Sequence, residues 1–114
     1  MAIVNQYKFL GNTLTTDLEQ TILTPAIASS GSVETVIIKS FRVTNTTGNT
    51  PTITITNGST KIVDTQTLAA NTSVEILTLP LVVDSGVALK VKMSSSDSTD
   101  IAVSYLNISQ EVTT

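Results

Sequence analysis

The residues able to do chemistry are few and of few kinds. Among 114 residues the chain has nine acidic and six basic side chains and two tyrosines, but neither cysteine nor histidine. Without thiolate or imidazole, most nucleophilic centres and most zinc or copper sites are excluded. Paired carboxylates remain, because two acids that face each other can run glycoside hydrolysis. Most of the acids, however, fall at predicted turns or on predicted solvent faces, namely Asp64, Glu75, Asp84, Asp97 and Asp100. We therefore expect no enzyme, and no catalytic, cofactor-binding or metal-ligating residues.

Two other motifs offer chemistry of a weaker kind. Residues 97–100 read DSTD, and their two carboxylates could supply oxygen ligands to calcium, although a polar turn is the simpler interpretation. Thr52, Thr54 and Thr56 alternate with isoleucine and put three hydroxyls on one strand face, as in some ice-binding proteins. That function needs several such ranks in a flat array, and no other strand repeats the pattern. The simpler interpretation is favoured, namely that these threonines cover the solvent-exposed face of a hairpin.

Charge and hydropathy exclude other classes of partner. The formal net charge is −3, and only Lys90 and Lys92 among the scattered bases could share a strand face. Nucleic-acid binding needs a basic patch, so we expect none. No segment approaches the ~20 apolar residues of a membrane helix, and the start MAIVNQYKFLGN does not resemble a signal peptide. We expect no membrane contact. Four Asn-x-Ser/Thr sequons are attributed to the abundance of serine and threonine, at Asn45, Asn57, Asn71 and Asn107.

Composition and periodicity both favour β structure. The chain is 40% hydrophobic and only 4% aromatic, so the core is expected to consist of Val, Ile, Leu and Ala. Apolar-polar alternation and turn residues predict strands at 2–9, 33–45, 52–56, 60–65, 72–79, 87–93 and 101–108. Seven or eight short strands at this spacing predict an all-β fold, a single antiparallel β-sandwich, Ig-like or jelly-roll-like. The domain is expected to span residues 1–111, with a loose tail at 112–114.

Some elements carry a specific expectation. In residues 33–45, Ile37, Phe41 and Val43 are predicted to share a face, with Lys39 breaking the pattern. A β-branched run of this length is predicted to contain a bulge or bend, or to be buried on both faces. Asn57-Gly58 predicts a tight hairpin. The apolar phase of 101–108 slips at Tyr105-Leu106.

Two segments keep alternative readings. Residues 19–23, EQTIL, are predicted to run extended into Thr24-Pro25, with a short helix over residues 16–23 as the alternative. Residues 2–9 are predicted to be a core strand, with an arm that joins a neighbour's sheet by strand addition as the alternative.

The order of several short motifs resembles a group of small structural proteins of tailed bacteriophage virions. The matching segments are YKFLG (7–11), TILTPA (21–26), VIIKSFRVTN (36–45), LAANTSV (68–74), GVALKV (86–91) and SYLNI (104–108). The resemblance covers most of the chain and brings no catalytic motif. It implies a β-sandwich component of a virion, either a decoration protein on the shell or a subunit of the neck or tail.

The sequence and the resemblance together lead to one functional hypothesis. We expect a non-enzymatic virion structural protein, assembled in the host cytoplasm, that decorates or cements a capsid by binding the major capsid protein. Binding to other virion proteins as a neck, collar or tail subunit is the first alternative. A carbohydrate-binding or adhesive module is the second, and it would need exposed rings among Tyr7, Phe9, Phe41 and Tyr105. We expect a homo-oligomer, a trimer or a higher ring.

Overall fold

The structure, a computed structural model, describes residues 3–28 and 31–111. Ala2 and the predicted tail at 112–114 lie outside the described residues. The described part is built of nine strands: β1 (Ile3–Leu14), β2 (Gln20–Leu23), β3 (Ser32–Asn45), β4 (Thr52–Asn57), β5 (Thr60–Thr67), β6 (Ser73–Glu75), β7 (Leu81–Val83), β8 (Leu89–Met93) and β9 (Thr99–Glu111). It includes no helix with the length and apolar character needed to cross a membrane. The predicted all-β class is confirmed.

The strands form two antiparallel sheets that pack face to face. The long sheet has the order β1-β9-β3, and β6 and β7 both pair with the far side of β3; the short sheet has the order β2-β8-β4-β5. Because β6 and β7 share one strand position, each sheet has four positions and the order is that of a jelly roll. The immunoglobulin order would instead put the first two strands side by side in one sheet. Of the two types of sandwich predicted, Ig-like and jelly-roll-like, the strand order is therefore that of the jelly roll.

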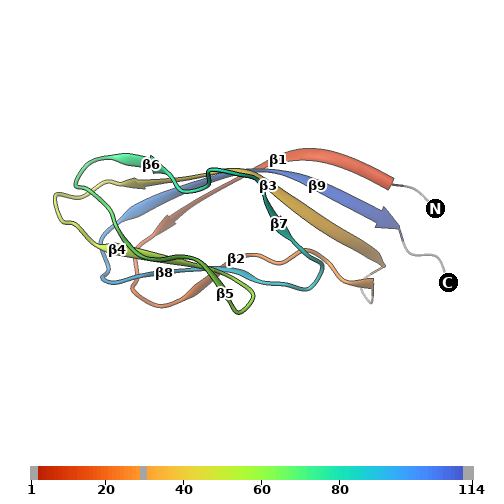
Figure 1. The fold of residues 1–114 in the computed structure, drawn as a ribbon, viewed down its shortest axis with the longest axis horizontal. Helices are drawn as coiled ribbons and strands as arrows, with labels where there is room; N and C mark the ends of the chain where they lie inside the picture. Colours follow the sequence, from red (N-terminus) through yellow and green to blue (C-terminus); the bar gives the residue numbers. More distant parts are fainter. Residues whose placement is uncertain (1–2, 29–30, 112–114) are drawn as a thin grey trace.

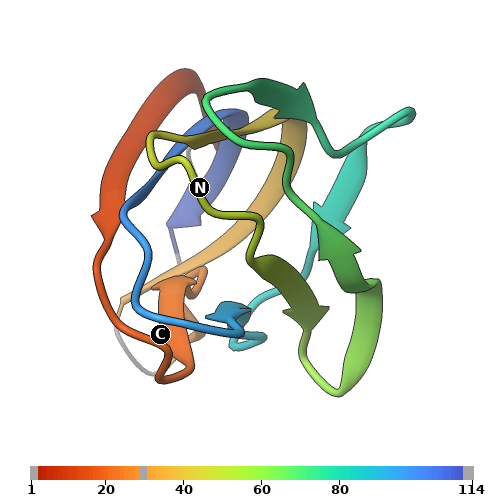
Figure 2. The same ribbon diagram turned by 90° about the vertical axis from the view of Figure 1, so that its left-hand side faces the viewer.

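Figure 2 shows the two sheets facing each other across an interior space. A single, mainly aliphatic core of buried side chains fills that space. Its buried hydrophobic side chains are Leu14, Val36, Ile38, Phe41, Val43, Ile53, Ile55, Leu68, Val83, Leu89, Val91, Met93, Ile101, Val103 and Tyr105. Val, Ile and Leu dominate, as predicted. Alanine, which was predicted to contribute, is not among these side chains, and Phe41, Met93 and Tyr105 supply the larger volumes instead.

The long strand β3 contains a bulge, one of the two predictions made from the length of its β-branched run. Its register against β9 steps from Ile38 opposite Tyr105 to Ser40 opposite Ser104, so Lys39 is the extra residue. The bulge shifts the buried positions by one, from Val36 and Ile38 to Phe41 and Val43. Ile37 therefore points away from the core, and the prediction that it shares a face with Phe41 and Val43 was wrong.

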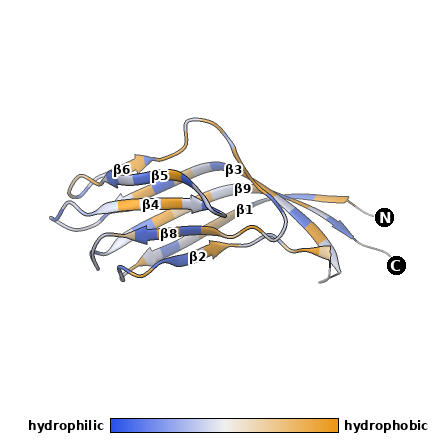
Figure 3. Cartoon of the chain, turned by 60° about the horizontal axis from the view of Figure 1, so that its bottom comes forward, coloured by the Kyte–Doolittle hydropathy of each residue, from blue (hydrophilic) through white to orange (hydrophobic). Residues whose placement is uncertain are grey.

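The C-terminal strand β9 shows no phase slip. It pairs with β1 in unbroken register from Thr99 to Gln110, and its buried side chains alternate regularly through Tyr105 and Asn107. The slip inferred at Tyr105-Leu106 was wrong, because the apolar residues Leu106 and Ile108 belong to the opposite face. Figure 3 shows hydrophobic and hydrophilic positions alternating along the strands.

The turn chemistry was read well from sequence. β4 and β5 form the predicted hairpin around Gly58, whose φ of 64° is the left-handed geometry that glycine favours. Residues 20–23 are extended, as predicted, and pair with β8. The predicted strand at 72–79 is shortened to β6, and the chain after Pro80 forms β7, which had not been predicted.

The molecule is elongated because the long sheet outgrows the short one. Its extents are 53 × 22 × 20 Å. In Figure 1 the first half of β1, the second half of β9 and the start of β3 project together beyond the short sheet. β1 is accordingly exposed along nearly its whole length, from Ile3 to Phe9 on both faces. The segment 2–9 is thus a strand over its described residues, but its side chains are not core.

Candidate interaction surface

Three of the acids that were weighed as catalysts, Glu75, Asp97 and Asp100, accept structural hydrogen bonds. Glu75 accepts bonds from the Ser40 hydroxyl and from the backbone N–H of Phe41 at 2.6 Å and of Leu77 at 3.3 Å. Partial burial alone would raise the pKa of Glu75, but these hydrogen bonds outweigh it and leave the pKa lowered. A carboxylate held ionised in this way is a poor general acid. The hydrogen bonds of Glu75 instead tie β6 to the bulge of β3.

Residues 97–100, which were predicted to be a polar turn, run into β9 at Thr99, and both of their carboxylates accept hydrogen bonds. Asp97 accepts hydrogen bonds from Ser95 at 2.5 Å and Asn49 at 2.8 Å, and these bonds lower its pKa. Asp100 accepts a bond from the Thr13 hydroxyl at 2.6 Å. Across residues 3–28 and 31–111, no three acidic side chains converge where they could hold a metal ion, and no pocket is found. The two carboxylates of the predicted loop thus serve different neighbours.

The outer face of the short sheet is polar and charged. Register places Thr21, Lys90, Thr56 and Lys61 in one row across β2, β8, β4 and β5. Lys92 lies opposite Thr54 on the same face, so Lys61 joins the two lysines that the sequence had grouped. The threonine rank of β4 is thus flanked by lysines, which interrupt the hydroxyl array that ice binding would need.

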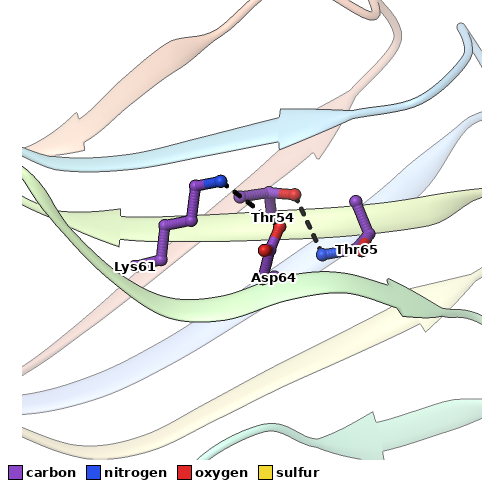
Figure 4. A network of polar contacts seen from close by, with 4 residues as sticks. All are labelled: Thr54, Lys61, Asp64 and Thr65. Carbon is purple, nitrogen blue, oxygen red and sulfur yellow. Dashed lines mark hydrogen bonds and ion pairs between the residues drawn. The ribbon is translucent and has the colours of Figure 1, made fainter.

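Acidic side chains form ion pairs with two of the lysines on this face. Lys61 lies 3.5 Å from Asp64 and Lys90 lies 3.8 Å from Glu19, both as exposed pairs. Figure 4 shows the first pair beside the bond from the Thr65 backbone N–H to Thr54 Oγ1, at 3.1 Å. Exposed pairs of this kind contribute little stability, about 0–1 kcal/mol. The short sheet therefore presents a solvated face, and the absence of nucleic-acid binding stays a prediction.

The aromatic side chains divide between the core and one surface. Phe41 is fully buried and Tyr105 is 9% exposed, so neither can line a groove. Tyr7 and Phe9, by contrast, are 77% and 68% exposed. They lie two residues apart on β1 and therefore point to the same side. The aromatic platform of a sugar-binding groove is not assembled, but two rings are gathered on the outer face of the long sheet.

An apolar row crosses this outer face completely. Register places Tyr7 of β1 opposite Leu106 of β9, Leu106 opposite Ile37 of β3, and Ile37 opposite Val82 of β7. Directly opposite residues of antiparallel strands point to the same face. Their sequence neighbours Val36, Ile38, Tyr105 and Val83 are buried, so the row itself faces outward. This row is the counterpart of the threonine-lysine row on the short sheet.

The rows beside it are also without charge. They are Phe9–Ser104–Ser40 on one side, then Asn5–Ile108–Thr35 and Ile3–Gln110–Val33 on the other. None of the members of these four rows is acidic or basic, but the exposed Lys39, the extra residue of the β3 bulge, lies between Ile37 and Ser40 beside them. We call the side chains Ile3, Tyr7, Phe9, Val33, Ile37, Val82, Leu106 and Ile108 the outer apolar face. Contiguous exposed apolar surface of this kind on a soluble protein marks an interaction site.

The Phe9 ring lies along its own strand, over Gly11. A Cβ built on Gly11 would stand 3.0 Å from Cε2 of Phe9, so a side chain there would displace the exposed ring by a few tenths of an ångström. Tyr7, Phe9 and Gly11 all fall within the YKFLG segment and all face outward. That segment thus contributes Tyr7 and Phe9 to the outer apolar face, while its Leu10 packs against the core.

The sequence held the signal for this face, although it was not recognised. Leu106 and Ile108 disturb the alternation of β9, and Ile37 fills the position between two buried residues of β3. A strand that is apolar in both phases is buried on both faces, either within the molecule or by a partner. Burial of the outer face by a partner was the interpretation that had not been considered.

The comparisons with known proteins bear on the fold. No protein-family model and no curated protein matches the sequence. The structure is similar to a chain of the Bacillus endospore appendages, a family of disulfide-linked pili, with a TM-score of 0.52, 14% identity, and coverage of 97% of this chain and 89% of that chain. It is also similar to a chain of the virus-like particle of extra small virus from the giant freshwater prawn Macrobrachium rosenbergii, with a TM-score of 0.52, 10% identity, and coverage of 99% and 82%. These two similarities support the sandwich fold.

A weaker similarity concerns a chain of the cyanophage Pam1 capsid asymmetric unit. Its TM-score is 0.39 at 18% identity, with coverage of 91% of this chain and 84% of that chain. A TM-score at this level does not establish a shared fold.

Proposed function

We propose that the protein is a non-enzymatic structural subunit of a virion, held on a protein lattice by its outer apolar face. The observation that carries this proposal is the uncharged apolar row from Tyr7 to Val82, which crosses the whole long sheet. Burying a charge in an interface costs several kcal/mol unless it is paired, whereas the side chains of this row carry no charge.

The fold is compatible with such a role. Jelly rolls are used in viral capsid domains, and the fold similarity extends to a chain of a virus-like particle. The similarity to pilus subunits suggests the alternative of a fibre. Those pili are disulfide-linked, however, and this sequence has no cysteine with which to form such links. A virion subunit is therefore the better-supported proposal.

Within the virion, we place the protein on the shell as a decoration or cement subunit that binds the major capsid protein. The solvated face of the short sheet would then point outward, while the outer apolar face lies on the lattice. A neck, collar or tail subunit is the alternative position, and it would use the same face against a ring of other virion proteins.

Quantitative mass spectrometry of purified particles tests this proposal. Hundreds of copies per particle would support a shell position, whereas about six to a few tens, as expected of closed rings, would indicate the neck or tail. Particles that carry no copy of the chain would overturn the virion role.

A rebinding assay tests the face itself. The double variant Phe9→Ser, Val82→Ser should fail to rebind particles stripped of the protein, because it interrupts two rows of the outer apolar face. Lys61→Ser, on the short sheet, is the matched control and should rebind as wild type. Equal rebinding by the double variant would exclude this face as the contact.

A further inference from the structure

Strand β1 has one edge without a partner among the described strands. It pairs with β9 through all twelve residues from Ile3 to Leu14, in unbroken register, and it is the terminal strand of the long sheet. In such a strand alternate residues direct their backbone N–H and C=O groups away from the existing neighbour. The free edge of β1 is therefore a long template for another strand.

The other sheet edges are protected by their geometry. β2 has four residues and an irregular register, and β6 and β7 have three residues each. β5 is longer, but its pairing with β4 is interrupted twice, Thr65 has a φ of 51°, and Lys61 and Asp64 lie on it. Short length, bulges and charge are the features by which proteins prevent edge pairing.

β1 has none of these protections. It contains no proline and no bulge, and its one charged residue is Lys8. Lys8 lies opposite the buried Tyr105 and so points to the inner side of the sheet, not to the outer apolar face. On both sides of the strand the flanking side chains are exposed, with Ile3 at 64%, Val4 at 49% and Tyr7 at 77%. An added strand would cover both its backbone groups and these side chains.

We propose that the free edge of β1 binds the β1 edge of a second copy of this chain, antiparallel and about a two-fold axis perpendicular to the long sheet. A second copy supplies a partner strand of equal length and the same regularity, which neither β2 nor β5 of a neighbour could offer. Because the axis keeps both outer faces on one side, the apolar row of one copy continues into that of the other. The outer apolar face would thereby double in length.

Lys8 restricts the register of this pairing. An axis through Lys8 would put two ammonium groups directly opposite each other, which destabilises a strand pair. An axis at Gln6 avoids that contact and puts Ile3 of one copy opposite Phe9 of the other. An axis at Tyr7 also avoids it and puts the two Tyr7 side chains opposite each other. β1 is exposed on both faces from Ile3 to Phe9, and the middle of that stretch is Gln6, so we centre the pairing on residues 6 and 7. This inference stands apart from the virion role, because it concerns the purified chain in solution.

Cysteine trapping tests the axis directly, since the chain has no native thiol. In the full chain, Gln6→Cys and Tyr7→Cys should be linked into covalent dimers by oxidation or by a short bis-maleimide. Asn12→Cys is the control on the same strand, because an axis at residues 6 and 7 puts its two copies more than ~30 Å apart at the rise of a β-strand. Sedimentation of the wild type should give twice the chain mass of 12.0 kDa.

Several results would overturn the inference. A monomer or a trimer in sedimentation would exclude the two-fold pair. Linking of Asn12→Cys as efficient as that of Gln6→Cys would show random collision. Linking between Gln6→Cys and Lys61→Cys in a mixture, without linking of Gln6→Cys to itself, would assign the contact to β1 and β5.

Two adjacent proline variants separate dimer loss from unfolding. Asn5 and Gln6 are both polar and exposed, and the N–H of one points to β9 while that of the other points to the free edge. Of Asn5→Pro and Gln6→Pro, the variant at the residue whose N–H points to β9 loses a hydrogen bond of the sheet, so it should melt at a lower temperature than the wild type. The other should keep the wild-type melting temperature and dimerise at least about tenfold more weakly, because it lacks an edge donor and adds a ring there. If the thermally stable variant dimerises as the wild type does, the edge is not the contact.

Discussion

At the scale of single residues, buried polar groups hold the connections of the jelly roll. Asn45 is 1% exposed, and its amide donates to the carbonyls of Asn49 at 2.7 Å and Ala69 at 3.2 Å, while its oxygen accepts from Thr47. Asn45 and Asn107 are both sequon residues, and their burial leaves no room for a glycan in the folded chain. Each buried polar atom that is satisfied in this way avoids a penalty of about 1–3 kcal/mol.

Glu34 has the same role at the projecting end of the long sheet. Its carboxylate accepts bonds from the Ala26 backbone N–H at 2.9 Å and the Asn107 amide at 3.1 Å, and these lower its pKa. Its own backbone carbonyl accepts a bond from the Ser85 hydroxyl at 2.6 Å. Glu34 therefore joins three segments that are distant in sequence.

The lowered pKa of Glu34 predicts a specific loss of stability in acid. A carboxyl whose pKa is depressed in the folded state stabilises the fold above its unfolded pKa of about 4.3, and this contribution is lost as pH falls through the folded pKa. Glu34→Gln has only one acceptor oxygen for two donors, so it should be less stable than wild type at pH 7. The difference in unfolding free energy should shrink as pH falls from 5 to 3, measured by urea unfolding. Glu19→Gln, which removes an exposed carboxylate, controls for the change in net charge, and a difference independent of pH would contradict the assignment.

At the scale of elements, much of the fold could be read from sequence, and the failures have a common cause. The Gly58 hairpin, the bulge at Lys39 and the alternation of β8 rest on local chemistry, which the sequence contains. The orientation of Ile37 and the phase of β9 depend on which apolar residues face the core and which face outward. That choice is made by the pairing of distant strands. The interaction surface was missed for the same reason, because its rows combine four strands that the sequence keeps apart.

The bulge in β3 makes a deletion experiment informative. Lys39 is the extra residue between Ile38 and Ser40, so its removal would leave a regular alternation with Ile38 and Phe41 still facing the core. Deletion of Lys39 should therefore give a folded protein with a cooperative thermal transition. Deletion of Arg42, another exposed base of the same strand, would invert the residues on one side of it and should abolish that transition. Circular dichroism melting compares the two, and an unfolded Lys39 deletion would mean that the bend itself is required.

The turn before β8 makes a prediction of the opposite kind. Gly86 has a φ of 76°, and a Cβ there would stand 2.7 Å from Cγ2 of Ile27. Gly86→Ala should lose about 1–3 kcal/mol of unfolding free energy, since an L-residue in this conformation is strained and the contact adds to the strain. Gly48→Ala is the matched control, because a Cβ at Gly48 meets nothing within 4 Å and its φ is not in the left-handed region. Equal stability of the two variants in urea unfolding would show that the turn relaxes freely.

At the scale of the whole molecule, the two outer faces have different tasks. The short sheet exposes threonines and lysines whose charges are offset by nearby acids, and it is suited to water. The long sheet exposes the outer apolar face and, at β1, a strand edge that no described element covers. Folding does not need either feature, because the core is complete without them. Both features are explained if the core supplies stability while the outer apolar face and the β1 edge supply association.

The two tyrosines offer a direct test of this separation. Tyr7 and Tyr105 lie on adjacent strands, but Tyr7 is 77% exposed on the outer apolar face while Tyr105 is 9% exposed in the core. Tyr105→Ser should cost about 3–5 kcal/mol of unfolding free energy, because a large side chain is removed from a packed site. Tyr7→Ser should change that free energy by less than about 1 kcal/mol and yet weaken association, as measured by urea unfolding and sedimentation of the same samples. A Tyr7→Ser variant that unfolds as readily as Tyr105→Ser would assign the ring to folding, and one that associates as the wild type does would remove it from the interface.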